Sequence, residues 1–311
     1  MQSTAISIKN LFKTYANGLA ALKGISLEIA QGDFFALLGP NGAGKSTTIG
    51  VLSTLVTKSS GEVEIMGHNM DTNAGAAKLS LGVVPQEFNF NQFEKVQDII
   101  LNQAGFYGVP YRHAKPCVDE YLKKLDLWDK RNEVSRNLSG GMKRRLMIAR
   151  ALVHSPKILI LDEPTAGVDV ELRRTMWDFL RYINEEKKVT IILTTHYLEE
   201  AENLCRGIAI IDKGEIIENT TVRELLSRVN KNVLQLELSE SIDKAPELSG
   251  CEVSLIDAKT IEVQTKPGLA INDIFNNLSK QNINVSGLRN TQSRLETLFV
   301  DITKNNKVDS A

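Results

Sequence analysis

The chain has 311 residues, of which 42% are hydrophobic and 24% charged. These are the proportions of a soluble globular protein, with room for one large and one small domain or for two medium ones. The formal net charge is −1, which excludes a global field that would draw the chain to nucleic acid or to an anionic membrane surface. The three cysteines lie far apart, which indicates reduced thiols and not a disulfide framework or a zinc site.

Neither a targeting segment nor a membrane span is expected. The N-terminal residues MQSTAISIKN contain no basic region followed by an apolar one, so we expect no secretory signal. The strongest apolar runs are short, such as ILIL at 158–161, whereas a membrane helix needs roughly 18 apolar residues.

Short β-type runs alternate with amphipathic helical stretches over the first two thirds of the chain. The expected strands are 5–11, 25–30, 34–39, 61–67, 81–85, 157–162, 189–195 and 207–212. Strands separated by helices predict a mainly parallel sheet that is covered on both faces. The early strands, joined by short turns, predict an antiparallel section beside it. Residues 88–150 show only helical patterns, so we expect a helical subdomain inserted into an α/β body.

After about residue 225 the pattern changes. The stretches VLQLELS, CEVSLI and TIEVQT alternate apolar and polar residues, and a helix (271–280), a strand (INVSGL) and a last helix (RLETLFVDIT) would follow. This predicts a small α+β appendage over 226–311 with a frayed polar end.

Residues 39–47 read GPNGAGKST, which fits G-x-x-x-x-G-K-[ST] between a buried strand and a helix. Glycines let such a loop curl until its amides point at phosphate oxygens. Lys45 would reach the β- and γ-phosphates, Ser46 would be a Mg²⁺ ligand, and Thr47 would contact the α-phosphate. The predicted nucleotide-binding residues are therefore Gly39, Pro40, Asn41, Gly42, Ala43, Gly44, Lys45, Ser46 and Thr47.

The run ILILDEPT (158–165) places two carboxylates at the end of an apolar strand. Asp162 suits holding Mg²⁺, partly through water, and Glu163 suits polarising an attacking water for in-line displacement. A base that activates water predicts a hydrolase and not a kinase. The alternative, a glutamate that only caps the next turn, is less favoured because it follows Asp162 and accompanies the phosphate loop.

Three further residues are weak signals when taken singly. Gln86 and His196 follow predicted strands, where an amide could meet Mg²⁺ and water and an imidazole could hold the γ-phosphate. Open α/β sheets bind ligands at the carboxyl ends of strands, which favours a catalytic role for both. Tyr15 follows the first strand and could stack on adenine, a contact worth on the order of 1–3 kcal/mol by analogy with other base–aromatic stacking.

Residues 138–145 read LSGGMKRR and open another expected helix. Ser139, Gly140 and Gly141 would offer a hydroxyl and unpaired amides at a helix N-terminus, which attracts anions. The alternative is an ordinary serine cap followed by two turn glycines, which would weaken the start of the helix. The basic run MKRRLMIAR that follows is expected to form a solvated helix face.

The order of these motifs resembles the ATP-binding cassette of ABC transporters. Phosphate loop, VPQ, LSGG, ILILDEPT, AGVD and TTH follow one another in that sequence, and the resemblance covers about residues 4–225. It implies an α/β P-loop NTPase fold of the ABC ATPase type. The chain also resembles the single-cassette subunits of bacterial multidrug-type ABC exporters, to which RLETLFVDIT is similar as a closing helix. Many relatives have leucine where Val168 stands in AGVD.

The resemblance implies that two cassettes pack head to tail. Each LSGG would then close over the γ-phosphate of the partner's ATP, much as an arginine finger supplied in trans contributes roughly 10³–10⁵ in rate. Ser139, Gly140 and Gly141 would bind nucleotide in trans, and Asp169 would lie at the dimer interface and link the two sites.

The segment EFNFNQF carries Phe88, Phe90 and Phe93. Aromatic residues in an inserted subdomain usually pack inward, but family members bind a cytoplasmic helix of their membrane partner beside this loop. Spaced aromatics among polar residues suit the centre of an interface, so docking is slightly favoured over core packing.

The sequence is thus interpreted as an ATPase subunit, with ATP and Mg²⁺ as cofactors, that drives a separate transmembrane permease. Its partners would be that permease and a second copy of the chain, with no nucleic acid. It would be cytoplasmic and peripheral on the cytoplasmic face of the inner (plasma) membrane. The first alternative is a soluble ABC ATPase in translation or DNA maintenance, whose relatives carry two cassettes or long coiled-coil inserts. The second is a GTPase-type switch, which needs a guanine-reading N-K-x-D segment that we do not expect here.

Overall fold

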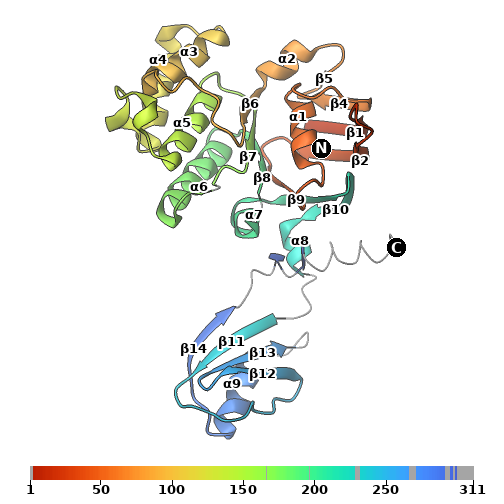
Figure 1. Ribbon diagram of the computed structural model, residues 1–311, viewed down its shortest axis with the longest axis vertical. Helices are drawn as coiled ribbons and strands as arrows, with labels where there is room; N and C mark the ends of the chain where they lie inside the picture. Colours follow the sequence, from red (N-terminus) through yellow and green to blue (C-terminus); the bar gives the residue numbers. More distant parts are fainter. Residues whose placement is uncertain are drawn as a thin grey trace. The chain divides into compact units, whose positions relative to one another are not determined.

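The computed structural model describes residues 3–165, 167–195, 197–227, 232–265 and 271–290, with 295, 296, 298 and 299. The chain divides into two compact units, Met1–Val222 and Arg223–Ala311, which are described separately below (Figure 1). Among the helices of the described part, none combines the length and apolar character needed to cross a bilayer.

A six-stranded sheet organises the first unit, in the order β10-β9-β3-β8-β7-β6. The five strands from β9 to β6 run parallel to one another, and β10 pairs antiparallel with β9. The strands are β3 (Phe34–Leu38), β6 (Leu81–Val84), β7 (Ile158–Asp162), β8 (Thr190–Thr194), β9 (Gly207–Asp212) and β10 (Glu215–Thr221). Every residue of β3, β8 and β9 is buried, as expected of parallel strands covered on both faces.

An antiparallel sheet, β2-β1-β4-β5, belongs to the same unit. It consists of β1 (Thr4–Thr14), β2 (Ala20–Ala30), β4 (Ser60–Ile65) and the short β5 (His68–Asn69). Apolar residues alternate along β2, so one face of this sheet is buried and the other is solvated. Both predicted features, the parallel sheet and the antiparallel section, are therefore confirmed.

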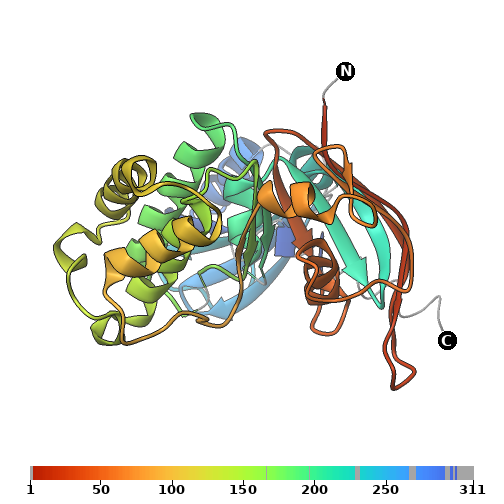
Figure 2. The ribbon, with the colours of Figure 1, turned by 90° about the horizontal axis from the view of Figure 1, so that it is seen from above.

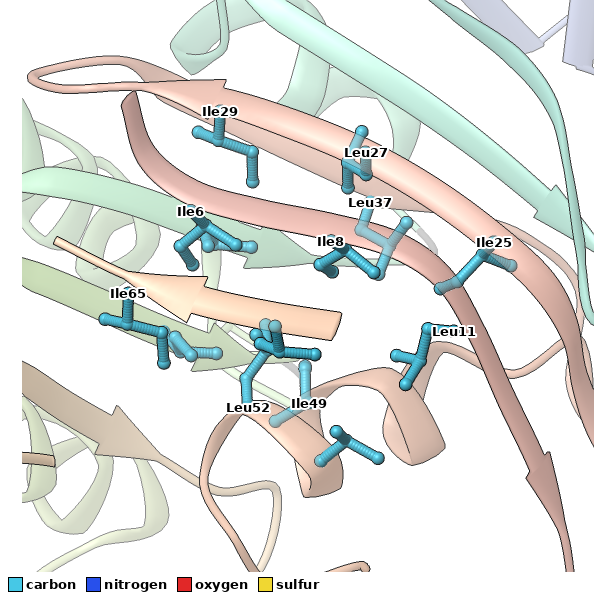
Figure 3. Close-up of a cluster of buried hydrophobic side chains, with 14 of the residues drawn as sticks. Ile6, Ile8, Leu11, Ile25, Leu27, Ile29, Leu37, Ile49, Leu52 and Ile65 are labelled. Carbon is cyan, nitrogen blue, oxygen red and sulfur yellow. The ribbon is translucent and has the colours of Figure 1, made fainter. Parts of the chain in front are cut away.

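The main core fills the space between the two sheets and helix α1 (Lys45–Leu52). Isoleucines and leucines of β1 and β2 point toward Leu37 of β3 and toward Ile49 and Leu52 of α1 (Figure 3). Fully burying one such side chain contributes about 1.5–3 kcal/mol. This packing fixes α1, and with it the loop that precedes it, against the end of β3.

The helical stretch lies between β6 and β7. It contains α3 (Val96–Phe106), α4 (Tyr111–Lys124), the short 3₁₀ helices η1 (Trp128–Lys130) and η2 (Ser135–Asn137), and α5 (Gly140–Leu152). All of these residues are described, and they form no strand, although Lys95 and Val134 make an isolated bridge. Helices α3 and α4 lie on the opposite side of the unit from the β1–β2 hairpin in both views (Figures 1 and 2).

Four more helices complete the first unit or follow it: α2 (Ala74–Leu79), α6 (Val170–Glu185), α7 (Leu198–Leu204) and α8 (Val222–Ser227). Asp169 caps α6, because its carboxylate accepts a hydrogen bond from the backbone N–H of Leu172 (2.9 Å).

The second unit contains a four-stranded antiparallel sheet with the order β12-β13-β11-β14 and helix α9, and all but the first residue of α8 also belongs to it. The elements are β11 (Asn232–Leu238), β12 (Cys251–Asp257), β13 (Thr260–Thr265), α9 (Ile271–Lys280) and β14 (Val285–Asn290). Leucines of β11 pack with Ile261 and Val263 of β13 and with Ile274 and Leu278 of α9. The predicted last helix lies for the most part outside the described residues.

The basic run of α5 is not a solvated face, so that interpretation is wrong. Arg144 is 5% exposed and Arg145 is 1% exposed. Arg145 donates to the carbonyl oxygens of Leu125 (2.5 Å) and Asp126 (3.3 Å). Guanidinium groups bury readily where backbone carbonyls meet their fixed donors, which helical periodicity does not reveal.

A buried amide ties α6 to the loop that leads into β3. Asn184 is 3% exposed, and its Nδ2 donates to the carbonyl oxygens of Gly32 (3.0 Å), Asp33 (3.3 Å) and Val189 (2.9 Å). Its Oδ1 accepts from Arg206 Nη2 (3.1 Å). One side chain thus satisfies backbone carbonyl groups that lead into β3 and into β8.

We expect Asn184→Ala to lower the free energy of unfolding of the first unit by about 2–4 kcal/mol, because several buried polar groups lose their partner at once. Urea unfolding followed by tryptophan fluorescence would measure the change. Asn203→Ala is the matched control: its amide donates only to the carbonyl of Glu199 at an exposed position (2.8 Å), so the loss should stay below about 1 kcal/mol. Equal losses of unfolding free energy in the two variants would contradict the stabilising role of the buried Asn184 amide.

Candidate functional site

A pocket of about 670 Å³ opens where β3, β6 and β7 end. It is lined by Tyr15, Leu19, Ala20, Ala21, Lys23, Asn41, Gly42, Ala43, Gly44, Lys45, Ser46, Thr47, Gln86, Asp162, Glu163 and Lys213. The phosphate-loop motif, the DE pair and Gln86 thus share one pocket, as the meeting of parallel strand ends predicts. Their individual roles remain predictions.

The loop between β3 and α1 has its shape because two positions exclude a side chain. A Cβ on Gly39 would lie 2.2 Å from the carbonyl oxygen of Ile211 in β9. Gly44 has φ of 118° and precedes the first helical residue, Lys45. These glycines let the chain turn closely over the sheet edge, so that the first amides of α1 face the pocket.

Lys45 lies across this loop. Its Nζ donates to the carbonyl oxygens of Gly39 (2.6 Å) and Pro40 (3.1 Å), and the residue is 8% exposed. Burial lowers the pKa of Lys45, and the carboxylates of Glu163 and Asp162 act in the opposite direction. The ammonium is therefore held between the loop carbonyls and the acidic pair, where an anion entering the pocket could recruit it.

The acidic pair is fixed by β8. Thr194 Oγ1 donates to Asp162 Oδ1 (2.5 Å), and the backbone N–H of Glu163 donates to the carbonyl oxygen of Thr194 (3.0 Å). Glu163 has φ of 48°, a left-handed conformation that is uncommon for a residue with a side chain and is concentrated at functional sites. The turn aims its carboxylate away from the strand, toward Gln86, whose Nε2 donates to Glu163 Oε2 (3.3 Å).

Tyr15 also lines the pocket and is half-buried. Its hydroxyl shares a hydrogen bond with Thr47 Oγ1 (3.2 Å), and the Lys13 ammonium lies 4.9 Å from the centroid of its ring. The structure therefore connects Tyr15 to the phosphate loop. Stacking of an adenine on its ring stays a prediction.

The remaining predicted site residues do not line this pocket. The described residues around it do not include Gly39 and Pro40 of the phosphate loop, nor Ser139, Gly140, Gly141 and Asp169. His196 lies outside the described residues, so its placement is untested.

The LSGG segment packs beside the start of α6. A Cβ on Gly141 would lie 3.0 Å from Leu172 Cδ1, which explains that glycine by packing within the chain. A Cβ on Gly140 would meet no described atom within 4 Å, so packing within this chain does not explain why this position is a glycine. Ser139 is exposed, and its Oγ accepts from the backbone N–H of Met142 (3.3 Å), which caps α5. The serine is a cap, but its hydroxyl hydrogen remains able to donate.

The aromatic segment after Gln86 is not core, and a second hollow adjoins it. Phe88 is 40% and Phe93 73% exposed. Phe90 is half-buried and lines a groove of about 610 Å³ together with Phe106, which is 87% exposed. Sequence analysis missed Phe106 because a single aromatic at the end of a helix gives no periodic signal. The full lining is Asn89, Phe90, Asn91, Glu94, Ile99, Leu101, Asn102, Gln103, Gly105, Phe106 and Arg150.

Several pocket residues also escaped prediction. Lys23 and Lys213 come from β2 and from the turn between β9 and β10, which meet because Lys23 N–H donates to Gly214 O and Gly214 N–H to Ala43 O, each at 2.9 Å. Only tertiary packing brings these segments together. Thr194, which does not line the pocket but bonds to Asp162, could have been suspected, since it is the first residue of TTH and lies within the predicted strand 189–195.

Comparison with known proteins agrees with this geometry. The family model described as ABC transporter matches residues 22–166. The chain is similar to the linearmycin resistance ATP-binding protein LnrL of Bacillus subtilis, with 33% identity over 307 residues that cover 96% of this chain and 98% of the relative. It is similar to the Nod factor export ATP-binding protein I of Burkholderia orbicola, with 35% identity over 86% of this chain and 92% of the relative.

Among solved structures, one similar chain is an ATP-binding cassette in a dimeric post-hydrolysis state bound to ADP and Pi. It matches with a TM-score of 0.65 and 28% identity, over 70% of this chain and 99% of that chain.

One argument against a GTPase-type switch is wrong. Residues 306–309 read NKVD, so an N-K-x-D run does exist. These residues lie outside the described part of the chain. What decides against the switch is the long match to ATP-binding relatives.

Proposed function

This chain belongs to the ABC transporter family of ATP-binding, ATP-hydrolysing proteins, and from that premise we propose that it is the ATPase subunit of a membrane exporter. Two copies would sandwich two MgATP and drive a separate permease. The observation that carries the proposal is the single pocket that joins the phosphate loop to Gln86, Asp162 and Glu163.

Within the pocket, each side chain would have a distinct task. The amides at the start of α1 and the Lys45 ammonium bind the phosphates, because both present positive charge where the substrate is most negative. Release of Lys45 from the carbonyls of Gly39 and Pro40 would accompany this binding. Glu163 would accept a proton from the attacking water, and Gln86, bonded to it at 3.3 Å, would help to orient that water.

The donor set fits a magnesium ion. Asp162 supplies one carboxylate, with Ser46 and Gln86 as further oxygen ligands in the same pocket. The described residues form no cluster of three or more His, Cys, Asp or Glu side chains able to hold a metal, and Mg²⁺ characteristically uses one or two carboxylates, waters and substrate phosphates. The ion would neutralise charge on the phosphates. His196 is proposed to hold the γ-phosphate, Thr47 the α-phosphate, and Tyr15 the adenine.

A second copy would complete each site. Ser139, Gly140 and Gly141 do not line their own chain's pocket, and a Cβ on Gly140 would meet no described atom within 4 Å. A phosphate carried by another molecule could therefore approach these amides closely. Asp169, exposed at the start of α6, would lie at this interface and link the two sites.

Similarity to exporter subunits supports a role in export and a location at the membrane. Two relatives are an ATP-binding protein of linearmycin resistance and an ATP-binding protein of Nod factor export. We propose that this chain likewise serves export, on the cytoplasmic face of the plasma membrane. Residues 4–225 would form the cassette and 226–311 the appendage. The alternative role in translation or DNA maintenance is not favoured by any of these names.

The groove beside Phe90 would receive a helix of the permease. Phe106 lines this groove, and Phe88 and Phe93 are neighbours of Phe90 in the sequence; all three rings are exposed. Aromatic anchors at the centre of an interface supply most of its binding energy. Asn89, Asn102 and Gln103 give it a polar rim.

We expect Phe90→Ala to reduce co-purification with the permease at least tenfold while leaving MgATP affinity within about threefold, because the groove lies apart from the pocket. The measurement is the amount of this chain recovered in membranes with and without the co-expressed permease. Tyr111→Ala, an exposed aromatic on α4 outside the groove, should leave recovery unchanged. If recovery never depends on the permease, the exporter assignment itself is wrong.

A further inference from the structure

The segment that joins β6 to α3 is held by an arginine from another helix. Arg144 of α5 donates through Nη1 to the carbonyl oxygen of Pro85 and through Nη2 to that of Gln86, each at 2.7 Å. Its guanidinium carbon also lies 5.2 Å from the centroid of the Phe88 ring. Two parallel donors on consecutive carbonyls fix both the position and the orientation of this short segment.

Arg144 is 5% exposed, so this contact is made away from solvent. Burial lowers the pKa of Arg144, and the carboxylates of Asp162 and Glu163 raise it. Because an arginine remains a cation at neutral pH, a buried positive charge faces the acidic pair of the pocket. In this low-dielectric position its electrostatic effect on those carboxylates is larger than that of a surface charge.

These contacts form a continuous path between two motifs. Arg144 follows Ser139, Gly140 and Gly141 on the same helix, α5. The backbone of Gln86 accepts from Arg144, and the side chain of Gln86 donates to Glu163 at 3.3 Å. A rotation of α5 large enough to displace the Arg144 guanidinium would therefore shift the backbone of Pro85 and Gln86 or break these two hydrogen bonds.

We propose that Arg144 is a positioning residue for catalysis: it holds the Gln86 side chain against Glu163 and makes that contact depend on the orientation of the LSGG helix. The inference rests on the proposed roles of Gln86 and Glu163. Helix α5, whose N-terminus would contact the partner's nucleotide, would in this way also set the position of Gln86 relative to Glu163 in its own chain.

Arg145 provides the contrast. It is also buried on α5 and donates to two carbonyl oxygens, those of Leu125 and Asp126. Both acceptors lie where α4 ends, inside the helical stretch and away from the lining of the pocket. Loss of either guanidinium leaves buried carbonyls unpaired, but only Arg144 is bonded to the segment that carries Gln86.

The test compares Arg144→Met with Arg145→Met in the full-length chain. Both variants should lower the melting temperature. We expect Arg144→Met to reduce kcat for ATP about 10- to 100-fold with KM within about threefold, since a displacement of 1 Å at a catalytic group can cost about 10²-fold. Arg145→Met should change kcat by less than about threefold. Arg144→Lys keeps the charge without the bidentate fork, so it should fold and lie between wild type and Arg144→Met.

A double-mutant cycle separates positioning from general damage. In a Gln86→Ala background, the side chain that Arg144 would position is absent. Adding Arg144→Met to this background should therefore lower kcat by less than about threefold relative to Gln86→Ala alone. If Arg144→Met does not fold, Arg144→Lys takes its place. The same full loss in both backgrounds would overturn the inference. If Gln86→Ala alone leaves kcat unchanged, the proposed role of Gln86 is wrong instead.

Discussion

Glu163→Gln is expected to bind MgATP with an affinity within about threefold of wild type while turning over at most a few per cent as fast. The amide keeps the size and planarity of the carboxylate but cannot accept a proton, and general-base catalysis contributes typically 10²–10⁴-fold. The hydrogen bond from Gln86 can persist, because an amide oxygen also accepts. The left-handed backbone at this residue, with φ of 48°, should tolerate the change, since both side chains share the same Cβ.

Phosphate release at saturating MgATP would measure the turnover, and equilibrium binding of MgATP would measure the affinity. Because bound nucleotide is not consumed, we also expect a nucleotide-locked dimer to accumulate on size-exclusion chromatography. Glu185→Gln makes the same chemical change at an exposed position on α6 and should leave turnover unaltered. Near-normal turnover in Glu163→Gln would show that Glu163 is not the general base.

The sequence located the pocket because its key residues follow strands. Asp162 ends β7, Gln86 follows β6, and the phosphate loop follows β3. In a parallel sheet these ends share one edge, so a pattern of buried strands suffices to bring the residues together. The apolar runs of β3, β7, β8 and β9 are nearly continuous, which makes such strands easy to recognise.

Reliance on apolar runs also explains why strand β10 was not predicted. Strand β10 (Glu215–Thr221) is a polar edge strand with little burial, so it lacks the apolar run that marks its neighbours. Strand β10 follows β9 through a turn at Lys213 and Gly214, which both have positive φ. The glycine of this pair was a turn signal that the sequence offered.

Arg144 shows the limit of periodicity. Its position in MKRRLMIAR looked solvated because the pattern counts charge as exposure. Its burial depends instead on two carbonyl oxygens of a segment 58–59 residues earlier. A cation can be buried wherever such acceptors surround it, and their location is a property of the tertiary fold.

Mixing two inactive variants is expected to restore nucleotide capture if LSGG acts in trans. Lys45→Ala removes the ammonium of the phosphate loop, and Ser139→Arg places a bulky charge at the exposed start of α5. Each variant alone forms a homodimer in which both sites are damaged. In a head-to-tail mixed dimer, one site contains both defects, whereas the other combines an intact Lys45 with an intact Ser139.

All chains would carry Glu163→Gln, so that captured MgATP is retained, and two affinity tags would isolate verified mixed dimers. We expect about one retained nucleotide per mixed dimer and almost none in either homodimer. Ser139→Arg also removes the cap on Met142 N–H, at a cost of about 1 kcal/mol. That loss is present in the mixed dimer as well, so it cannot produce a recovery.

The decisive control places the same two substitutions in one chain. A mixed dimer of Lys45→Ala/Ser139→Arg with an otherwise unaltered partner contains the same substitutions as the first mixture, but in trans geometry each site now has one defect and no nucleotide should be retained. If LSGG served its own chain's nucleotide, the outcomes would be reversed, because the partner chain would keep a complete site and the first mixture would have none. The pair of dimers therefore distinguishes the two geometries whatever the stability of each variant, and retention only in the second would reject the role of Ser139 in trans.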